Sequence, residues 1–407
     1  MMRSLSIRIR HLLAAAKGLF GRRAGRLLQR TGRAGIGAVV SRIVSDAILF
    51  NETACGVDTA IRRVGFIAAK LAEFGYSDPH ADEHGNISVV VAGREPAGRA
   101  ALLFADASSP PDAGADCLVT LDGDTARGRG LAEDSIGVAA LLALAEHLAG
   151  NGTRQDLDCV LLFAAAGSER GDTQPLREFI RGRADGIAWA VNVRSLLLGR
   201  IAERPLGACR LRVRARTEER DVAVAGGASS AISALAAIAS RLGSIRWDSA
   251  NSTFLNIARL EAGAGFGWHA TDGIMEIEIL STEAATLEVA RNAVQATIEM
   301  TSEESGADAE VEVTGFYPVA KPGINAVLTE TLRRVYTKLR IRPLPVSIPD
   351  QAAFFSSLGI PALSIGITTG RRSLTEESVD IPPIQTGFRQ LLALLEECAR
   401  SPTGGGR

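Results

Sequence analysis

The stretch GRGLAEDSIGVAALLALAEHL, residues 128–148, decides the fold class of this chain. It runs from a glycine-rich turn through acidic residues at positions 133 and 134 into an almost continuous apolar segment. Apolar residues recur at helical spacing from Val138 to Ala145, which predicts a helix over Ser135–Leu148. Two carboxylates therefore stand directly before a long helix.

Helices and strands alternate on both sides of this stretch. The hydrophobic pattern predicts these neighbours: the helix Thr59–Gly75, the strands Ile87–Val91 and Ala101–Ala105, the strand Cys159–Ala164, the helix Pro175–Ile180 and the strand Ile187–Val193. Near-continuous apolar strands that alternate with helices are typical of a mostly parallel sheet with helices on both faces. This part of the chain is therefore predicted to be an α/β domain.

The pattern changes between Gly207 and Pro318. The predicted order there is strand Cys209–Ala215, helix Ser229–Leu242, strands Thr253–Leu260 and Ile274–Leu280, helix Glu283–Met300 and strand Ala309–Val313. This is the β-α-β-β-α-β order of a ferredoxin-like α+β unit. Afterwards the α/β pattern resumes with the helix Ile324–Leu339, the strand Ala362–Ile365 and a terminal helix through Leu391–Leu395.

The chain is thus predicted to hold one discontinuous α/β domain and one inserted domain. The α/β domain takes residues 36–206 and 319–400, and the inserted domain takes residues 207–318. A basic leader (1–35) and a short tail (401–407) complete the chain. Two domains agree with the length of 407 residues, which exceeds what a single hydrophobic core usually supports.

Composition excludes several function classes. The formal net charge of -1 argues against nucleic acid as a partner. The five cysteines show no CxxC or CxxxC spacing, so neither a disulfide framework nor a thiolate zinc site is expected, and a reducing, cytoplasmic location is favoured. No apolar run approaches the length of roughly 20 residues that a membrane helix needs.

The leader differs from the rest of the chain. It contains nine lysine and arginine residues and no acidic residue, and apolar residues from Ile9 to Phe20 fall at helical spacing. One interpretation is a segment that lies on an anionic membrane surface. The other is a poorly ordered leader, or a start codon assigned too far upstream. Lys17 interrupts the apolar stretch, so a signal peptide is not predicted.

Six short strings point to a known family. They are Asp82-x-x-Gly85-Asn86, residues 128–139, FAAAGSERG at 163–171, LGRI at 198–201, SAI at 230–232 and GIPA at 359–362. In this order and spacing, over about residues 39–397, they resemble the M20 family of dinuclear zinc peptidases, in particular its peptidase T-like branch. The resemblance implies a zinc-peptidase-like α/β domain, an inserted dimerisation domain and a homodimer.

The resemblance also implies which positions hold the two zinc ions and the general base. Glu133 stands at the bridging carboxylate, Glu169 at an adjacent ligand, and Asp106 at the first histidine. Ser168 stands where the family has its catalytic glutamate. A serine hydroxyl cannot act as a general base near neutral pH, so no catalytic residue is assigned.

The remaining family positions also carry other residues. Ser108 matches the first aspartate, unless a frame shifted by two places Phe104 and Asp106 at the first pair. Asn192 matches a later acid and Ser373 the final histidine. In the inserted domain Asp221 and Leu280 replace a histidine and an arginine. None of the chain's five histidines stands at a strand end where a zinc ligand belongs.

These substitutions leave three interpretations open. The first is a protein that has lost zinc-dependent hydrolysis, needs no cofactor, and binds a peptide-like ligand or partners an active relative. Its remaining carboxylates Glu133 and Glu169 would then pair with arginines such as Arg129 and Arg170. The second is an active peptidase or amidohydrolase that holds zinc or a harder divalent cation. Its ligands would be drawn from Asp106, Glu133, Asp134, Glu169 and Asp350. The third is a scaffold held peripherally at the membrane by the leader.

Overall fold

The structure is a computed structural model, and it describes residues 37–53, 59–94, 98–107, 118–151, 156–165, 173–202, 206–218, 230–247, 253–321, 323–373 and 376–400. The leader and the tail lie outside these residues, and so do Ser108, Ser168, Glu169 and Asp221. Within the described part, every helix is too short or too polar to span a bilayer.

The chain folds as two compact units. The first takes Met1–Glu203, Lys321–Val346 and Phe354–Arg407, and the second takes Arg204–Ala320 and Ser347–Ala353. The first unit is therefore discontinuous in sequence.

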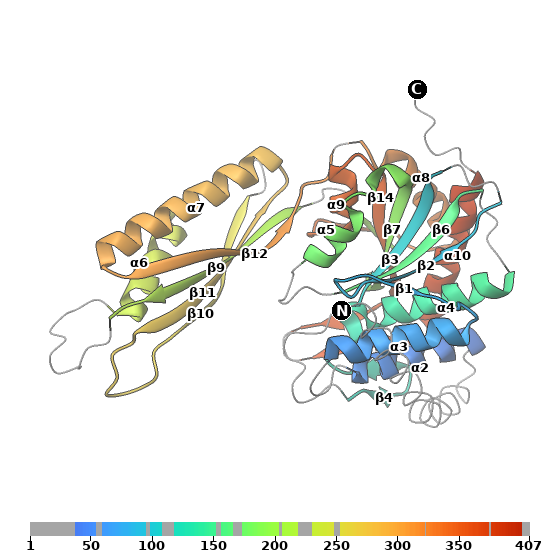
Figure 1. Cartoon of the computed structure of the whole chain (residues 1–407), viewed down its shortest axis with the longest axis horizontal. Helices are drawn as coiled ribbons and strands as arrows, with labels where there is room; N and C mark the ends of the chain where they lie inside the picture. Colours follow the sequence, from blue (N-terminus) through green and yellow to red (C-terminus); the bar gives the residue numbers. More distant parts are fainter. Residues whose placement is uncertain are drawn as a thin grey trace. The chain divides into compact units, whose positions relative to one another are not determined.

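The first unit is built on a six-stranded sheet with the order β1-β2-β6-β3-β7-β14 (Figure 1). Its strands are β1 (His80–Ala81), β2 (Ile87–Val91), β6 (Asp158–Ala164), β3 (Ala100–Asp106), β7 (Ile187–Leu196) and β14 (Ala362–Thr368). The last four run parallel, whereas β2 runs antiparallel to β6. The predicted mostly parallel sheet is confirmed.

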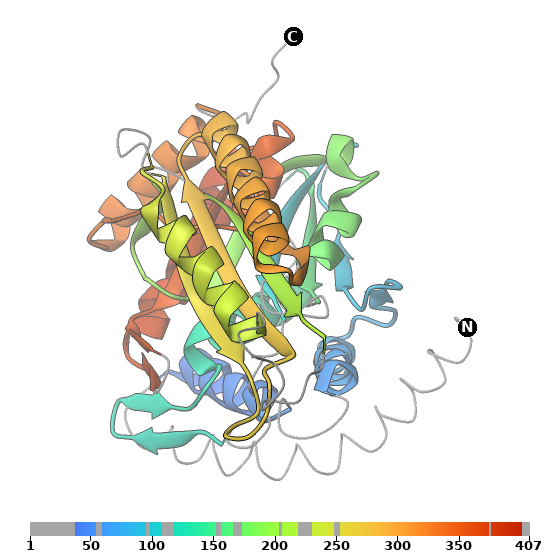
Figure 2. The same cartoon turned by 90° about the vertical axis from the view of Figure 1, so that its left-hand side faces the viewer.

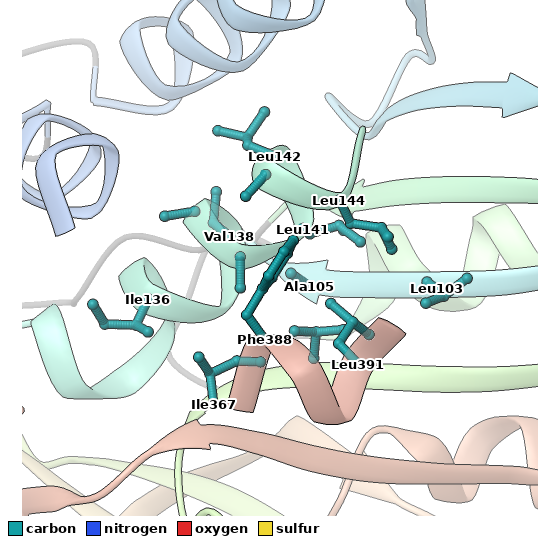
Figure 3. Packing of buried hydrophobic residues seen from close by; sticks show 14 of the residues in the cluster. Leu103, Ala105, Ile136, Val138, Leu141, Leu142, Leu144, Ile367, Phe388 and Leu391 are labelled. Carbon is teal, nitrogen blue, oxygen red and sulfur yellow. The ribbon is translucent and has the colours of Figure 1, made fainter. Parts of the chain in front are cut away.

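Helices pack around this sheet. They are α2 (Ala38–Glu52), α3 (Thr59–Glu73), α4 (Ile136–Asn151), α5 (Gln174–Ile180), α8 (Ala326–Leu339), most of α9 (Ala352–Ser357) and α10 (Pro383–Arg400). Figure 3 shows α4 and α10 packed together, with Phe388 of α10 beside Leu141 and with Leu103 and Ala105 of β3 close by. Phe104, which the pleat turns to the opposite face, contacts Phe355 of α9 at a ring separation of 5.1 Å. Both faces of the sheet are therefore covered.

Glycine allows α4 to approach the sheet closely. A Cβ atom at Gly137 would meet the backbone oxygen of Val193 in β7, so no larger residue fits without displacing the helix. The close approach brings the beginning of α4 to the carboxyl end of β7. The acidic residues that precede α4 are thereby held at the same edge of the sheet.

Several elements of this unit are not predicted by the sequence pattern. A second sheet has the order β15-β16-β5-β4, with β4 (Thr120–Asp122), β5 (Thr125–Arg127), β15 (Gly370–Arg372) and β16 (Glu377–Asp380). A parallel pair joins β8 (Arg200–Ala202) to β13 (Leu344–Val346), and α2 precedes α3. One turn of π-helix, η1 (Leu131–Ser135), comes before α4.

The second unit has the predicted β-α-β-β-α-β order. Its elements are β9 (Gly207–Arg216), α6 (Ala231–Ser244), β10 (Phe254–Ala262), β11 (Asp272–Ser281), α7 (Ala284–Ser305) and β12 (Asp308–Tyr317). The strands form an antiparallel sheet with the order β10-β11-β9-β12. Figure 2 shows α6 and α7 side by side over one face of this sheet, where they bury Leu211 and Val213 of β9.

The opposite face of the sheet in the second unit, which carries no helix, is charged. Alternate residues of β9 are arginines, and their partners stand on the flanking strands. Arg210 pairs with Glu278 at 2.8 Å and Arg212 with Glu276 at 2.9 Å, both on β11. Cross-strand pairs of opposite charge stabilise a sheet, so this ladder supports the unit without an apolar cover.

Candidate functional site

The acidic residues before α4 lie on a firmly anchored turn. Gly130 has a φ of 82° and starts the π-helical turn η1. The N–H of Ala132 donates to Glu377 Oε2 at 3.2 Å, and Glu377 belongs to the second, small sheet of this unit. The N–H groups of Ile136 and Gly137 donate to Ser195 Oγ at 3.1 and 3.2 Å, which caps the beginning of α4. π-Helical turns are frequent at functional sites, and this one presents Glu133 and Asp134.

Glu133 is engaged by an arginine from a distant part of the chain. Arg372 Nη2 on β15 lies 2.5 Å from Glu133 Oε1, although the two residues are 239 positions apart. The Glu133 side chain is only one-fifth exposed. The small sheet formed by β4, β5, β16 and β15 makes this contact possible, because it places β15 alongside η1. The carboxylate at the bridging position is thus occupied by a guanidinium group.

Asp134 is more deeply placed than Glu133. It is 6 % exposed, and Arg194 Nη2 lies 3.9 Å from its Oδ1. Burial raises its pKa well above the ordinary value, and the nearby charges of Asp106 and Glu133 raise it further. Arg194 and Arg372 act in the opposite direction but do not outweigh burial. The pKa of Glu377 is also raised, again mainly by burial.

A third arginine, Arg63, is buried in the same part of the unit. Arg63 of α3 is 3 % exposed, its guanidinium carbon stands 4.4 Å from the centre of the Phe50 ring, and its Nη1 donates to the Ala107 backbone oxygen at 3.2 Å. Burial lowers its pKa to about 10, while Asp134, Asp106 and Glu133 act to raise it. A group with that pKa is still charged at neutral pH.

The other family positions that the structure describes do not join a ligand set. Asn192 is fully buried in β7, and within the described residues neither its Oδ1 nor its Nδ2 has a hydrogen-bond partner. The Ser373 hydroxyl bonds to the backbone of Glu376 and closes a turn. Asp350 belongs to the second unit, where its Oδ1 accepts the N–H of Ala352 at 2.9 Å. Leu280 also lies in the second unit, on β11.

The Asp82-x-x-Gly85-Asn86 string has a structural role. Asp82 Oδ1 accepts the N–H of Asn86 at 2.9 Å, and the buried Asn86 side chain donates to the Pro175 oxygen at 2.9 Å. Asn86 Oδ1 accepts the N–H of Ala165 at 2.8 Å. One side chain therefore holds the chain on both sides of the segment that contains Ser168 and Glu169.

Comparison with protein-family models gives no match, and no curated protein sequence matches. Solved structures do match. The aminopeptidase PepT of Bacillus cereus has a TM-score of 0.64 at 16% identity, covering 88% of this chain and 99% of that chain. The YXEP protein of Bacillus subtilis, described as a dinuclear metal binding peptidase from the M20 family, has 0.58 at 14%, covering 88% and 98%.

Human carnosine dipeptidase 1 matches with a TM-score of 0.67 at 14% identity, covering 89% of this chain and 99% of that chain. This chain has the M20 peptidase fold. The likeness spans nearly the full length of each of these structures, so both units take part in it. At such identities the likeness shows the M20 fold alone.

The described residues do not fit the dinuclear metal centre that the M20 fold implies. Among them, no group of three or more His, Cys, Asp or Glu side chains is arranged to hold a metal ion. The donor set lacks histidine, Glu133 is bound by Arg372, and Asp134 lies beside Arg194. Guanidinium groups stand close to the carboxylates that would have to meet a cation.

The sequence pattern indicates the carboxylates of this site but not its arginines. Arg63, Arg194 and Arg372 come from α3, β7 and β15, which only the folded chain brings together. One signal was readable: Arg63 stands one residue before Val64, on the side of a predicted amphipathic helix that also carries Phe66 and Ile67. A charged residue among core positions needs a partner of opposite charge, and the carboxylates already named as candidate metal ligands could supply one.

Proposed function

We propose that this chain is a non-catalytic protein on the M20 peptidase fold, which has lost zinc-dependent hydrolysis and acts by binding. The observation that carries the proposal is the pair of Glu133 and Arg372. A bridging carboxylate must face two cations, and here it faces a guanidinium group instead. Ser168 at the general-base position adds to this because a hydroxyl has no useful basicity near neutral pH.

The proposed role is binding rather than chemistry. The chain would bind a peptide-like ligand, or serve as the partner of an active relative with the same fold, in the cytoplasm. We further propose a homodimer formed through the second unit. The strand β10 supports this, since it leaves Phe254 and Leu260 exposed and lies at the edge of the sheet formed by the described strands.

Metal content and hydrolysis of the purified full chain test this proposal. The protein is dialysed against trace zinc, manganese and magnesium, and bound metal is measured by plasma mass spectrometry. We expect much less than one ion per chain, and no release of amino acids from di- and tripeptides above the rate of a Glu133→Gln variant. One or two ions per chain, lost together with hydrolysis in Glu133→Gln, would establish the active carboxylate-site alternative instead.

A further inference from the structure

The Arg63 side chain is buried in the first unit at a high expected cost. It is 3 % exposed on α3, next to core residues of the same helix such as Phe66 and Ile67. Removing a charged group from water costs several kcal/mol unless opposite charges and hydrogen bonds compensate. The residue is therefore retained in the core only if its surroundings repay that cost.

Two contacts fix where the guanidinium group lies. Its central carbon lies over the Phe50 ring of α2, 4.4 Å from the ring centre, in cation–π geometry. Its Nη1 donates to the backbone oxygen of Ala107, the residue that follows Asp106 at the end of β3. Arg63 therefore lies at the carboxyl end of the parallel strands, where Asp106 and Asp134 also lie. The charges of these two residues act on Arg63 together with that of Glu133.

We infer that Arg63 is a fixed internal counter-ion for Asp106 and Asp134, and that it supplies from within the protein the positive charge that carboxylates at this edge require. Two further arginines lie near the same carboxylates: Arg194 beside Asp134, and Arg372 bonded to Glu133. The inference rests on the proposed absence of a metal centre. It explains why the acidic cluster is stable although no metal ion neutralises it.

The shape of the side chain is part of the inference. A guanidinium group is planar, so it can stack on Phe50 and still direct N–H groups along its edge toward oxygens. A lysine ammonium group has neither property. Arg63 consequently differs from a surface arginine, whose loss changes stability little.

A double-mutant cycle on the full chain tests the inference. Arg63→Met keeps much of the volume and removes the charge, and Asp134→Asn replaces one neighbouring carboxyl group by an amide. We expect Arg63→Met to lower the melting temperature by about 6–10 °C, as breaking a buried ion pair does in a unit of this size. Asp134→Asn in the same chain is expected to restore at least half of that loss. Arg333→Met, at an exposed position of α8, is the matched control and is expected to change little.

The possible results separate clearly. A double variant no more stable than Arg63→Met would mean that Arg63 acts only by packing on Phe50, and would overturn the inference. If Arg63→Met does not fold, recovery of soluble folded protein by adding Asp134→Asn supports the inference, and failure to recover counts against it. Metal bound to the unaltered chain would overturn the proposed function, whereas the cycle reports on the counter-ion alone.

Discussion

Glu133 and Arg372 form an ion pair at 2.5 Å that joins the π-helical turn η1 to the edge strand β15. Its members come from the acidic motif and from the region of the expected final histidine. The pair thus connects the first and the last segment of the discontinuous first unit. The ion pair can also be tested without a substrate, because its disruption is expected to change the free energy of unfolding.

Breaking this pair is expected to cost a moderate amount of stability. Arg372→Ala should lower the free energy of unfolding by about 1 kcal/mol, because both side chains remain partly exposed and water screens the interaction. A cycle with Glu133→Gln, followed by urea unfolding, gives the coupling energy. Arg371→Ala, an exposed neighbour on the same strand, is the control. A coupling energy near zero would contradict the assigned pair.

Asn86→Ala is expected to be strongly destabilising. The side chain is 1 % exposed and bonds to the Pro175 oxygen and the Ala165 N–H, so its removal leaves buried groups unpaired. The expected loss is about 2–4 kcal/mol, measured by urea unfolding. Asn151→Ala at the exposed end of α4 should cost far less. Equal effects of the two substitutions would show that the Asn86 contacts are not formed in solution.

The charged ladder of the second unit is expected to respond to salt. Arg212 lies 2.9 Å from Glu276 with its side chain less than one-fifth exposed, whereas the mostly exposed Arg216 lies 3.8 Å from Asp272. Arg212→Met should lose about 1 kcal/mol at low salt and less in 1 M NaCl, because ions screen the pair. Arg216→Met should change little under either condition. Unfolding followed by intrinsic fluorescence in both buffers measures the difference, and a salt-independent loss at Arg212 would refute the ionic origin.

Asp46 is expected to make the stability of the fold depend on pH, in a direction that its pKa shift determines. Its carboxylate on α2 pairs with Lys70 Nζ at 2.9 Å, yet burial outweighs this partner and raises the pKa of Asp46 above its ordinary value. Because the folded-state pKa is raised, the protonated Asp46 carboxyl group contributes stability that is complete below about pH 4. This contribution is lost as the pH rises through the folded-state pKa and the carboxyl group loses its proton. Asp46→Asn should therefore gain stability relative to the unaltered chain between pH 4 and 7.

Thermal unfolding at several pH values checks this trend for Asp46. Asp122→Asn, at an exposed position of β4, serves as the control. A difference that shrinks with rising pH would mean that Lys70, rather than burial, determines the behaviour of Asp46. The comparison uses differences between variants, so general acid unfolding of the chain cancels.

Much of the fold was predictable because its core elements are long and strongly apolar. The strand Ile87–Val91 was predicted with its observed bounds, and β3 was predicted to within one residue at each end. The helix α7 extends beyond Met300 to Ser305, where Gly306 with a φ of 65° ends it, since the polar final turn carries no hydrophobic signal.

Short elements of mixed polarity were missed. The strands β4 and β5 have three residues each, and only the Gly123-Asp124 loop between them marks a hairpin. The same strands form part of the sheet that carries Arg372 to Glu133. The ion pairs of the site could not be predicted for that reason: pairing depends on tertiary placement of a sheet that local patterns barely indicate.

The discontinuity of the first unit has a consequence for biosynthesis. Strand β7 pairs with β14 along its free edge, but β14 is translated only after the whole Arg204–Ala320 segment. At roughly 5–20 residues per second, about 8–30 seconds pass between the synthesis of β7 and that of β14, and that edge stays open meanwhile. During this interval the inserted unit can complete its own sheet, while the first unit still lacks β14 and α10. The order of translation thus exposes an apolar strand edge to chaperones, and makes the final segment the one that closes the core.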